Sequence, residues 1–275
     1  MNYCFGVDIG GTTVKIGLFE ETGTIVEKWE IPTNTLADGE AILPDIAFSL
    51  KTKIEERKLS EEDILGIGVG VPAPVTAEGI VNGSANLGWK YKEVKKEMEE
   101  LTGLKAYIGN DANVAALGEM WKGGGAGEKN MIMVTLGTGV GGGVIIDGKM
   151  LVGNNGAGGE IGHICVNYEE NDRCGCGNKG CLEQYASATG IVRLAEQKLK
   201  TEKRETILNK AAITAKDVFD AVKAGDEVAD EIAAEFGKYL GYGLANLAAV
   251  VNPAVFVMKS FIRHADNQLK FQFSC

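Results

Sequence analysis

The sequence predicts an α/β protein built from two similar halves. In each half an apolar strand leads through a Gly/Thr turn into further strands, and then helix, strand and helix follow. The two turns, at residues 10–13 and 137–142, are weak internal echoes of each other. A Gly-rich stretch at 123–127 indicates a linker. We therefore expect domains at 1–122 and 123–275, with a cleft between them where both turns face one ligand.

The first half begins with a predicted antiparallel meander. Its strands are expected at 3–7, 14–19 and 24–31. Helical periodicity follows over 36–58, where Pro44 predicts a kink or a late start. The continuous apolar run 64–71 suits a buried strand. The half is completed by a short helix at 94–101, a strand at 106–108 and a helix at 113–122.

The second half repeats the order of strands before helices. Strands are expected at 131–136, 143–146 and 150–152, with a final one at 255–257. Amphipathic helices are expected at 187–200, 215–224 and 227–250.

Composition and charge exclude several classes of protein. A chain of 275 residues can bury a substantial core, and its 38 glycines indicate many tight turns. A net charge of −10 argues against a nucleic-acid surface and against an anionic membrane. The sequence has neither an apolar run of transmembrane length nor the pattern of a signal peptide. With six cysteines and no disulfide pattern, we expect the reducing cytoplasm.

One short stretch has the residues of a metal site. His163 is followed by Cys174, Cys176 and Cys181. Four nitrogen and sulfur ligands in one loop suit a closed, tetrahedral Zn²⁺ site, whereas the alternative is a chance cluster of free thiols. Because thiolates must lose protons to bind, metal binding would become part of folding this loop.

Two glutamates flank the predicted metal ligands. Glu160 lies three residues before His163, and Glu183 lies two residues after Cys181. A metal that fixes His163 and Cys181 would also orient both carboxylates, which could then bind a polyhydroxyl ligand. The residues alone leave open whether both glutamates are instead solvated loop charges.

The two Gly/Thr turns suit polyphosphate. Small residues leave backbone N–H groups free to form an anion nest. Thr12, Thr13 and Thr138 could add hydroxyl donors, and Lys15 a positive charge. Neither turn is a Walker A loop, because a strand follows instead of a helix.

Asn110 and Asp111 come where a strand gives way to a helix. Functional side chains of α/β proteins gather at the carboxyl ends of strands, so Asp111 could take the proton from a hydroxyl that attacks a phosphoryl group. The alternative is that Asp111 only caps the helix.

Five segments together resemble one known family. DIGGTTVK, GNDANVAALGEMW, VTLGTGVGGG, GAGGEIGH and CGCGNKGCLE are similar to motifs of the ROK family of repressors and sugar kinases, most of all to its bacterial ATP-dependent glucokinases. The resemblance runs from about residue 4 to 257. It implies an actin-like, ribonuclease-H-like fold of two domains, and transfer of the ATP γ-phosphoryl group to the 6-hydroxyl of glucose. It also implies a homodimer, which is common in the family.

The resemblance also implies roles for residues of this sequence. Asp111 would be the general base, and Asn110 a sugar ligand. The sugar hydroxyls would further be bound by Glu160, His163 and Glu183, with Asn86 near the same pocket. The first phosphate motif matches at Asp8, Gly10, Gly11, Thr12, Thr13 and Lys15, with Asp8 near Mg²⁺. The second matches at Gly137, Thr138, Gly139, Gly141 and Gly142. His163 would contact both zinc and sugar.

After VVNPAVFV the family pattern breaks. The family continues with a Gly-Gly-Gly turn and further helices that hold adenosine, whereas this sequence reads MKSFIRHADNQLKFQFSC. We expect a truncated or frameshifted end that weakens nucleotide binding. Three alternatives to an active glucokinase follow: a catalytically impaired sugar-binding protein, a kinase for fructose, mannose or N-acetylmannosamine, and a sugar-responsive repressor.

Overall fold

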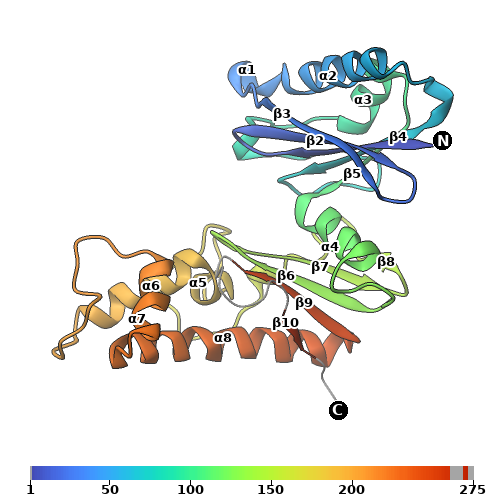
Figure 1. Cartoon of the computed structure of the whole chain (residues 1–275). Helices are drawn as coiled ribbons and strands as arrows, with labels where there is room; N and C mark the ends of the chain where they lie inside the picture. Colours follow the sequence, from blue (N-terminus) through green and yellow to red (C-terminus); the bar gives the residue numbers. More distant parts are fainter. Residues whose placement is uncertain (1, 261–268, 272–275) are drawn as a thin grey trace. The chain divides into compact units, whose positions relative to one another are not determined.

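The structure, a computed structural model, describes residues 2–260 and 269–271. The chain forms two compact units (Figure 1). The first comprises Met1–Leu117 with Val152–Gly158, and the second comprises Gly118–Leu151 with Gly159–Cys275. Each unit contains one five-stranded sheet. The boundary falls inside helix α4 (Asp111–Lys122), which contributes its first turns to the first unit.

The sheet of the first unit has the order β3-β2-β1-β4-β5. Its strands are β1 (Tyr3–Ile9), β2 (Thr13–Glu20), β3 (Ile25–Pro32), β4 (Ile64–Val71) and β5 (Ala106–Asn110). The first three form the predicted antiparallel meander, and β4 and β5 add in parallel to β1. Parallel addition brings the carboxyl ends of β1, β4 and β5 to the same edge of the sheet.

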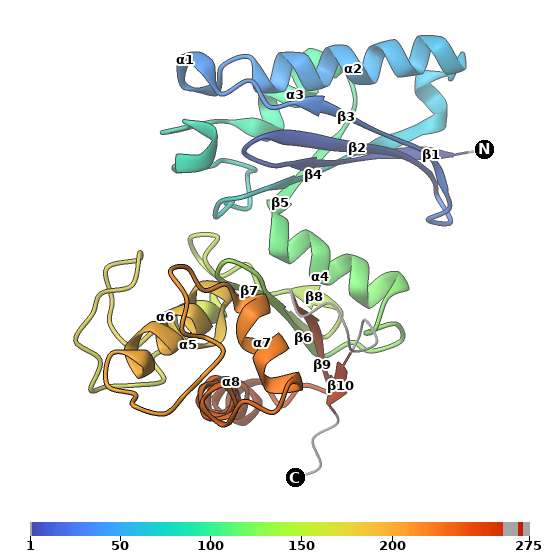
Figure 2. The ribbon, with the colours of Figure 1, turned by 60° about the vertical axis from the view of Figure 1, so that its left-hand side comes forward.

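Two helices cover one face of this sheet, α2 (Ile42–Arg57) and α3 (Val94–Thr102) (Figure 2). The predicted helix at 36–58 starts late. A short α1 (Leu36–Gly39) precedes α2, and inside it Ala37 and Asp38 have φ of 50° and 56°. Pro44 is the third residue of α2, where its missing N–H costs no helical hydrogen bond. Two 3₁₀ turns, Glu61–Asp63 and Ala85–Leu87, complete the first unit.

The sheet of the second unit has the order β10-β9-β6-β7-β8. Its strands are β6 (Met131–Leu136), β7 (Val140–Ile146), β8 (Lys149–Met150), β9 (Val255–Ser260) and β10 (Leu269–Phe271). Strand β7 begins three residues before the predicted 143–146, so the second Gly/Thr turn is shorter than expected. Strand β9 runs parallel to β6. The predicted break in the family pattern falls largely on 261–268 and 272–275, outside the described residues.

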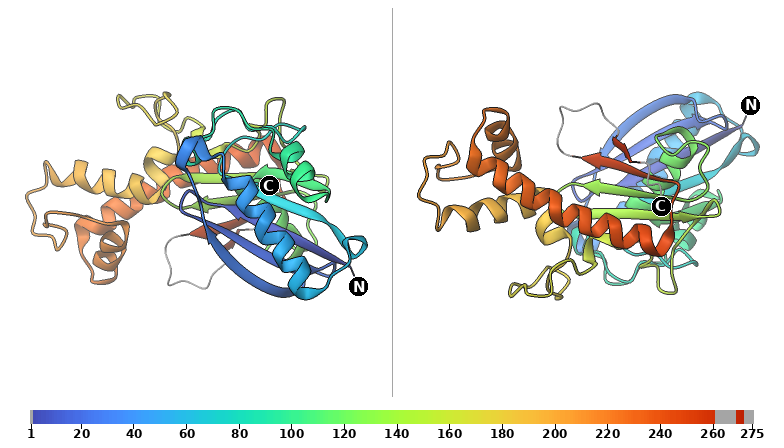
Figure 3. Two further views of the ribbon diagram at one scale, coloured as in Figure 1. Left: turned by 90° about the horizontal axis from the view of Figure 1, so that it is seen from above. Right: turned by 90° about the horizontal axis from the view of Figure 1, so that it is seen from below.

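The helices of the second unit pack around α8 (Glu227–Val251), the long helix in Figure 3. The others are α5 (Glu183–Ala186), α6 (Ala188–Leu199) and α7 (Ala215–Lys223), with a 3₁₀ turn at Ile161–His163. Asp226 caps α8 by accepting from the N–H groups of Val228 and Ala229. Within the described ranges, no helix is both long and apolar enough to cross a membrane.

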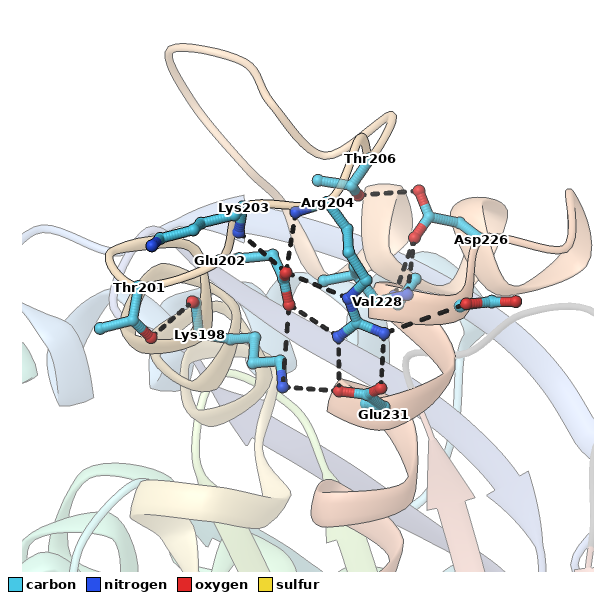
Figure 4. A network of polar contacts seen from close by, with 11 residues as sticks. Lys198, Thr201, Glu202, Lys203, Arg204, Thr206, Asp226, Val228 and Glu231 are labelled. Atoms are coloured by element: carbon cyan, nitrogen blue, oxygen red, sulfur yellow. Dashed lines mark hydrogen bonds and ion pairs between the residues drawn. The ribbon is translucent and has the colours of Figure 1, made fainter.

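An ion-pair network ties the loop after α6 to the first turns of α8 (Figure 4). The guanidinium of Arg204 donates to Glu202 at 2.7 Å and to both oxygens of Glu231 at 2.8 and 2.9 Å. Lys198 reaches Glu231 at 2.5 Å. Bidentate pairing fixes the direction of the Arg204 side chain, and so joins loop and helix.

Candidate active site and metal-binding loop

The first Gly/Thr turn joins β1 to β2. The N–H of Gly10 donates to the carbonyl of Thr13 at 3.1 Å. A Cβ on Gly10 would lie 2.8 Å from that same oxygen, so only glycine fits here. Among the described residues, no group accepts from the N–H of Gly11 or Thr12. This turn therefore has the free donors that an anion needs.

Three predicted site residues lie beside the first turn. Asp8, near the end of β1, is directly opposite Lys15 of β2, so the two side chains share one face of the sheet. Asn86 lies in the 3₁₀ turn Ala85–Leu87, and its carbonyl would be 3.4 Å from a Cβ on Gly11. The structure thus brings Asp8, Lys15 and Asn86 to the turn that the sequence singled out.

Asn110 and Asp111 lie at the junction of β5 and α4, and their side chains make different hydrogen bonds. The side-chain oxygen of Asn110 accepts from the N–H of Asn113 at 3.2 Å, which is the capping interaction. The amide of Asn110 donates to the carbonyl of Ala73 at 3.3 Å. Asp111 is the first residue of α4, and its carboxylate accepts from the N–H of its neighbour Ala112 at 2.7 Å. The helix-capping role that the sequence suggested for Asp111 is therefore filled by Asn110.

Asp111 has the electrostatics of a base. Partial burial raises the pKa of this carboxyl, and the negative charge of Asp8 raises that pKa further, against the hydrogen bond from Ala112. A raised pKa makes a carboxylate a stronger proton acceptor. A Cβ on Gly70 would lie 3.6 Å from the Cα of Asp111, an ordinary contact distance, so Asp111 lies beside β4.

The four predicted metal ligands come together in the second unit. Ligand atoms of His163, Cys174, Cys176 and Cys181 all lie within 4.8 Å of one another. The Nδ1 of His163 is 3.8 Å from the sulfur of Cys174, and the sulfurs of Cys176 and Cys181 are 3.6 Å apart. Metal–sulfur bonds of about 2.3 Å in a tetrahedron place the ligand atoms about 3.8 Å apart. The four residues therefore fit a tetrahedral ion.

Glycines and burial shape the metal-binding loop. A Cβ on Gly180 would lie 1.9 Å from the carbonyl of Asn167, so the loop closes only with glycine there, at φ 68°. A Cβ on Gly162 would lie 2.0 Å from the carbonyl of Val140, which lets the turn of His163 pack on β7. Burial raises the pKa of the Cys181 thiol to about 12.

Glu183 links the metal-binding loop to the second Gly/Thr turn. One carboxylate oxygen accepts from the N–H of Val140 at 3.1 Å, and the other lies 3.6 Å from the sulfur of Cys174. A carboxylate has about four acceptor positions, so Glu183 keeps capacity for a ligand. Glu160 is exposed, directly before the turn of His163. The sequence indicated Glu183 as a ligand group but not its contact with Val140.

The second turn comprises residues 137–139. The N–H of Gly137 donates to the carbonyl of Gly139 at 3.0 Å. Within the described part of the chain, nothing accepts from the N–H of Thr138 or Gly139. Gly141 and Gly142 were expected in this turn, but both lie inside β7. A Cβ on Gly142 would be 2.3 Å from Ile161, so this glycine serves packing.

The sequence gives no sign of two threonines that hold these turns. Thr33 contacts the first turn and Thr189 the second, each through its hydroxyl. Thr33 is 23 residues from Gly10 and Thr189 is 51 residues from Thr138, so no local spacing indicates either contact.

The arrangement defines a class of protein. Two units, each with a five-stranded sheet and a Gly/Thr turn between its first antiparallel strands, form the actin-like, ribonuclease-H-like fold that was predicted. The sequence model of the ROK family matches residues 4–272. The chain belongs to the ROK family.

Relatives and solved structures of this family are similar over most of the chain. The glucokinase of Halalkalibacterium halodurans is 44% identical over 270 residues, which are 96% of this chain and 82% of that protein. The glucokinase of Thermotoga maritima is 35% identical over 96% of this chain and 83% of its own length. The xylose repressor of Bacillus subtilis is 29% identical, over 94% of this chain and 64% of the repressor.

Two crystal structures show the same fold. The ROK hexokinase from Thermus thermophilus superposes with a TM-score of 0.78 at 30% identity, over 94% of this chain and 81% of that one. A ROK family glucokinase from Streptomyces griseus, in complex with glucose and AMPPNP, gives 0.72 at 33% identity, over 94% and 83%.

Proposed function

We propose that this protein is an ATP-dependent glucokinase that transfers the γ-phosphoryl group of ATP to the 6-hydroxyl of glucose. The observation that carries the proposal is Asp111, a carboxylate of raised pKa at the carboxyl end of a parallel strand, relieved of capping by Asn110. The 44% identity to a glucokinase over 96% of the chain supports the reaction and the sugar.

In the proposed mechanism Asp111 accepts the proton of the 6-hydroxyl as that oxygen attacks the γ-phosphorus. Phosphoryl transfer needs little covalent chemistry from a protein, so most of the rate comes from positioning and from stabilising charge. The free N–H groups of Gly11, Thr12, Thr138 and Gly139 bind phosphate oxygens, and Lys15 adds a positive charge.

Sugar recognition is assigned to Glu160, His163 and Glu183, with Asn110 and Asn86. Carboxylates accept from sugar hydroxyls, and the half-buried imidazole can donate or accept. Asn110 already has one amide contact to Ala73, which fixes its side chain for this role. Preference among glucose, fructose, mannose and N-acetylmannosamine depends on pocket shape around the varied hydroxyl, and a panel of these four sugars measures it.

Two metal ions belong to the proposal. Zn²⁺ would be held by His163, Cys174, Cys176 and Cys181, whose donor atoms already have tetrahedral spacing, and it would stabilise the loop that carries the sugar ligands. Mg²⁺ neutralises phosphate charge when bound, and the exposed carboxylate of Asp8 is the hard oxygen ligand that would hold it. Reduced cysteines as ligands suit the cytoplasm. A homodimer is proposed from the family resemblance.

The substitution Asp111→Asn tests the function. It should lower kcat by at least about a hundredfold, because general-base catalysis contributes typically 10²–10⁴-fold. Glucose affinity, measured by calorimetric titration, should change by less than about threefold. Asp63→Asn, in a 3₁₀ turn of the same unit, is the matched control and should keep full activity. Equal loss of turnover and glucose binding in Asp111→Asn would refute the general-base role.

Two other functions make different predictions. A sugar-responsive repressor would bind glucose without consuming ATP, and the 29% identity to a xylose repressor is lower than the identity to glucokinases. A catalytically impaired sugar-binding protein would also bind glucose without turnover, but would not bind DNA. Measured formation of ADP in the presence of glucose separates both from the kinase.

A further inference from the structure

In each Gly/Thr turn, a threonine from outside the turn donates a hydrogen bond to a carbonyl of the turn. At the first turn, the hydroxyl of Thr33 donates to the carbonyl of Gly10 at 2.6 Å, and the N–H of Thr33 donates to the carbonyl of Thr12 at 2.9 Å. Thr33 comes directly after β3, so an adjacent strand end supplies both donors.

The second turn has an equivalent contact from a different element. The hydroxyl of Thr189, in the first turn of α6, donates to the carbonyl of Thr138 at 2.8 Å. Beside it, the N–H of Ala188 donates to the carbonyl of Gly137, also at 2.8 Å. The hydroxyl of Thr189 is itself 3.0 Å from that of Ser187, the residue that caps α6. The turn carbonyls are thus bound from the helix side.

Binding a carbonyl fixes the direction of the next N–H. In a planar trans peptide, the C=O of one residue and the N–H of the following residue point in opposite directions. The contact of Thr33 with the Gly10 carbonyl therefore turns the N–H of Gly11 away from Thr33. The contact of Thr189 with the Thr138 carbonyl likewise turns the N–H of Gly139 away from Thr189. Within the described residues, neither N–H has another acceptor.

We infer that Thr33 and Thr189 are a pair of positioning residues, each of which holds the free N–H groups of its own turn in the direction that binds phosphate. The inference rests on the proposed kinase function. Neither threonine touches the phosphates. Each acts through one carbonyl of its turn. The same type of contact occurs in both halves of the chain, although it comes from the end of strand β3 in one half and from helix α6 in the other.

The same contact explains why the Gly10 carbonyl is not satisfied within the hairpin. The N–H of Gly10 donates across the turn to Thr13, but the carbonyl of Gly10 accepts from the Thr33 hydroxyl. If the hydroxyl were removed, that carbonyl would be free to rotate toward another donor. The N–H of Gly11 would then rotate with it and leave the anion-binding direction.

Substitutions that remove only the hydroxyl test the inference. Valine has the shape of threonine without the donor, whereas serine keeps the donor. We expect Thr33→Val and Thr189→Val each to raise the KM for ATP by about 3- to 10-fold, the range of one net hydrogen bond. The KM for glucose should change by less than about twofold. Thr33→Ser and Thr189→Ser should restore the KM for ATP to within about twofold of the wild type.

Two threonines in the same regions serve as matched controls. Thr35 lies two residues after Thr33 and makes no capping hydrogen bond, and Thr201 follows the other end of α6 and donates to Lys198. Thr35→Val and Thr201→Val should leave the KM for ATP unchanged. If either valine variant at 33 or 189 misfolds by circular dichroism, the alanine variant removes the same hydroxyl and replaces it in the comparison.

A nucleotide titration separates this inference from the proposed function. ATP binding is measured by calorimetry without glucose, for the wild type and for all four variants at 33 and 189. If the wild type binds ATP but does not phosphorylate glucose, the proposed function fails. The difference in ATP affinity between the valine and serine variants then still tests the positioning role of Thr33 and Thr189. Equal ATP affinity of the wild type and the valine variants, or serine variants as weak as valine ones, would overturn the inference. A wild type that binds no ATP overturns both.

Discussion

The link between Glu183 and the second turn can be tested by adding one methyl group. In Gly139→Ala the new Cβ would lie 2.0 Å from the nearer carboxylate oxygen of Glu183. Because a carboxylate ends a flexible side chain, the oxygen would move by about 1 Å or more instead of distorting the backbone. That movement breaks its 3.1 Å hydrogen bond from the N–H of Val140.

The magnitude follows from the lost contact. A hydrogen bond to a charged group contributes about 1.5–3 kcal/mol, and the half-buried position of Glu183 favours the lower end. We therefore expect Gly139→Ala to lower the free energy of unfolding by about 1.5 kcal/mol. Gly137→Ala is the matched control, because a Cβ there meets nothing within 4 Å. It should stay within about 0.5 kcal/mol of the wild type.

Urea unfolding of both variants, followed by circular dichroism, measures the difference. Bound zinc should be retained less well in Gly139→Ala than in Gly137→Ala, since Glu183 also lies against Cys174. If the two alanine variants unfold at the same urea concentration and hold zinc equally, Glu183 does not join the loop to the turn.

Two further predictions concern metal and pH. Cys176→Ser should lower bound zinc, measured by atomic absorption, and should weaken glucose binding as well. Cys4→Ser in the other unit is the control and should change neither quantity. Full zinc with normal glucose affinity in Cys176→Ser would argue against a positioning role of the metal. Hydrogen bonds from Arg204 lower the pKa of Glu202 and of Glu231 from the usual 4.5 to about 2. Because both pKa values are depressed in the folded state, their stabilisation is present above pH 4.5 and is lost as pH falls toward 2. Glu231→Gln should therefore flatten the loss of thermal stability in that window, and an unchanged slope would argue against the network.

The fold and the metal ligands could be read from local patterns. Strand β4 shows as a continuous apolar run, and the meander as three apolar segments broken by Gly turns. His163 and the three cysteines stand in one loop, so their spacing alone indicates a shared ion. Such features depend on residues close in sequence, which is why they are visible without a structure.

Other parts of the site depend on contacts between distant residues. Gly141 and Gly142 read as a continuation of the turn, but Ile161 packs against Gly142 and pairing with β6 extends β7 back to Val140. Asn110 and Asp111 are equally good caps by residue type, and only the contact to Asn113 assigns the cap to Asn110. The hydroxyl of Thr189 contacts the carbonyl of Thr138, which lies 51 residues earlier in the sequence, and no periodicity reveals such a contact.

Phosphoryl transfer from ATP to glucose can be measured directly. The purified chain is incubated with Mg²⁺, ATP and glucose, and glucose 6-phosphate and ADP are both quantified, with bound zinc determined on the same sample. We expect equal amounts of the two products from the wild type and neither product from Asp111→Asn. Glucose bound by zinc-loaded protein without any glucose 6-phosphate would contradict this expectation.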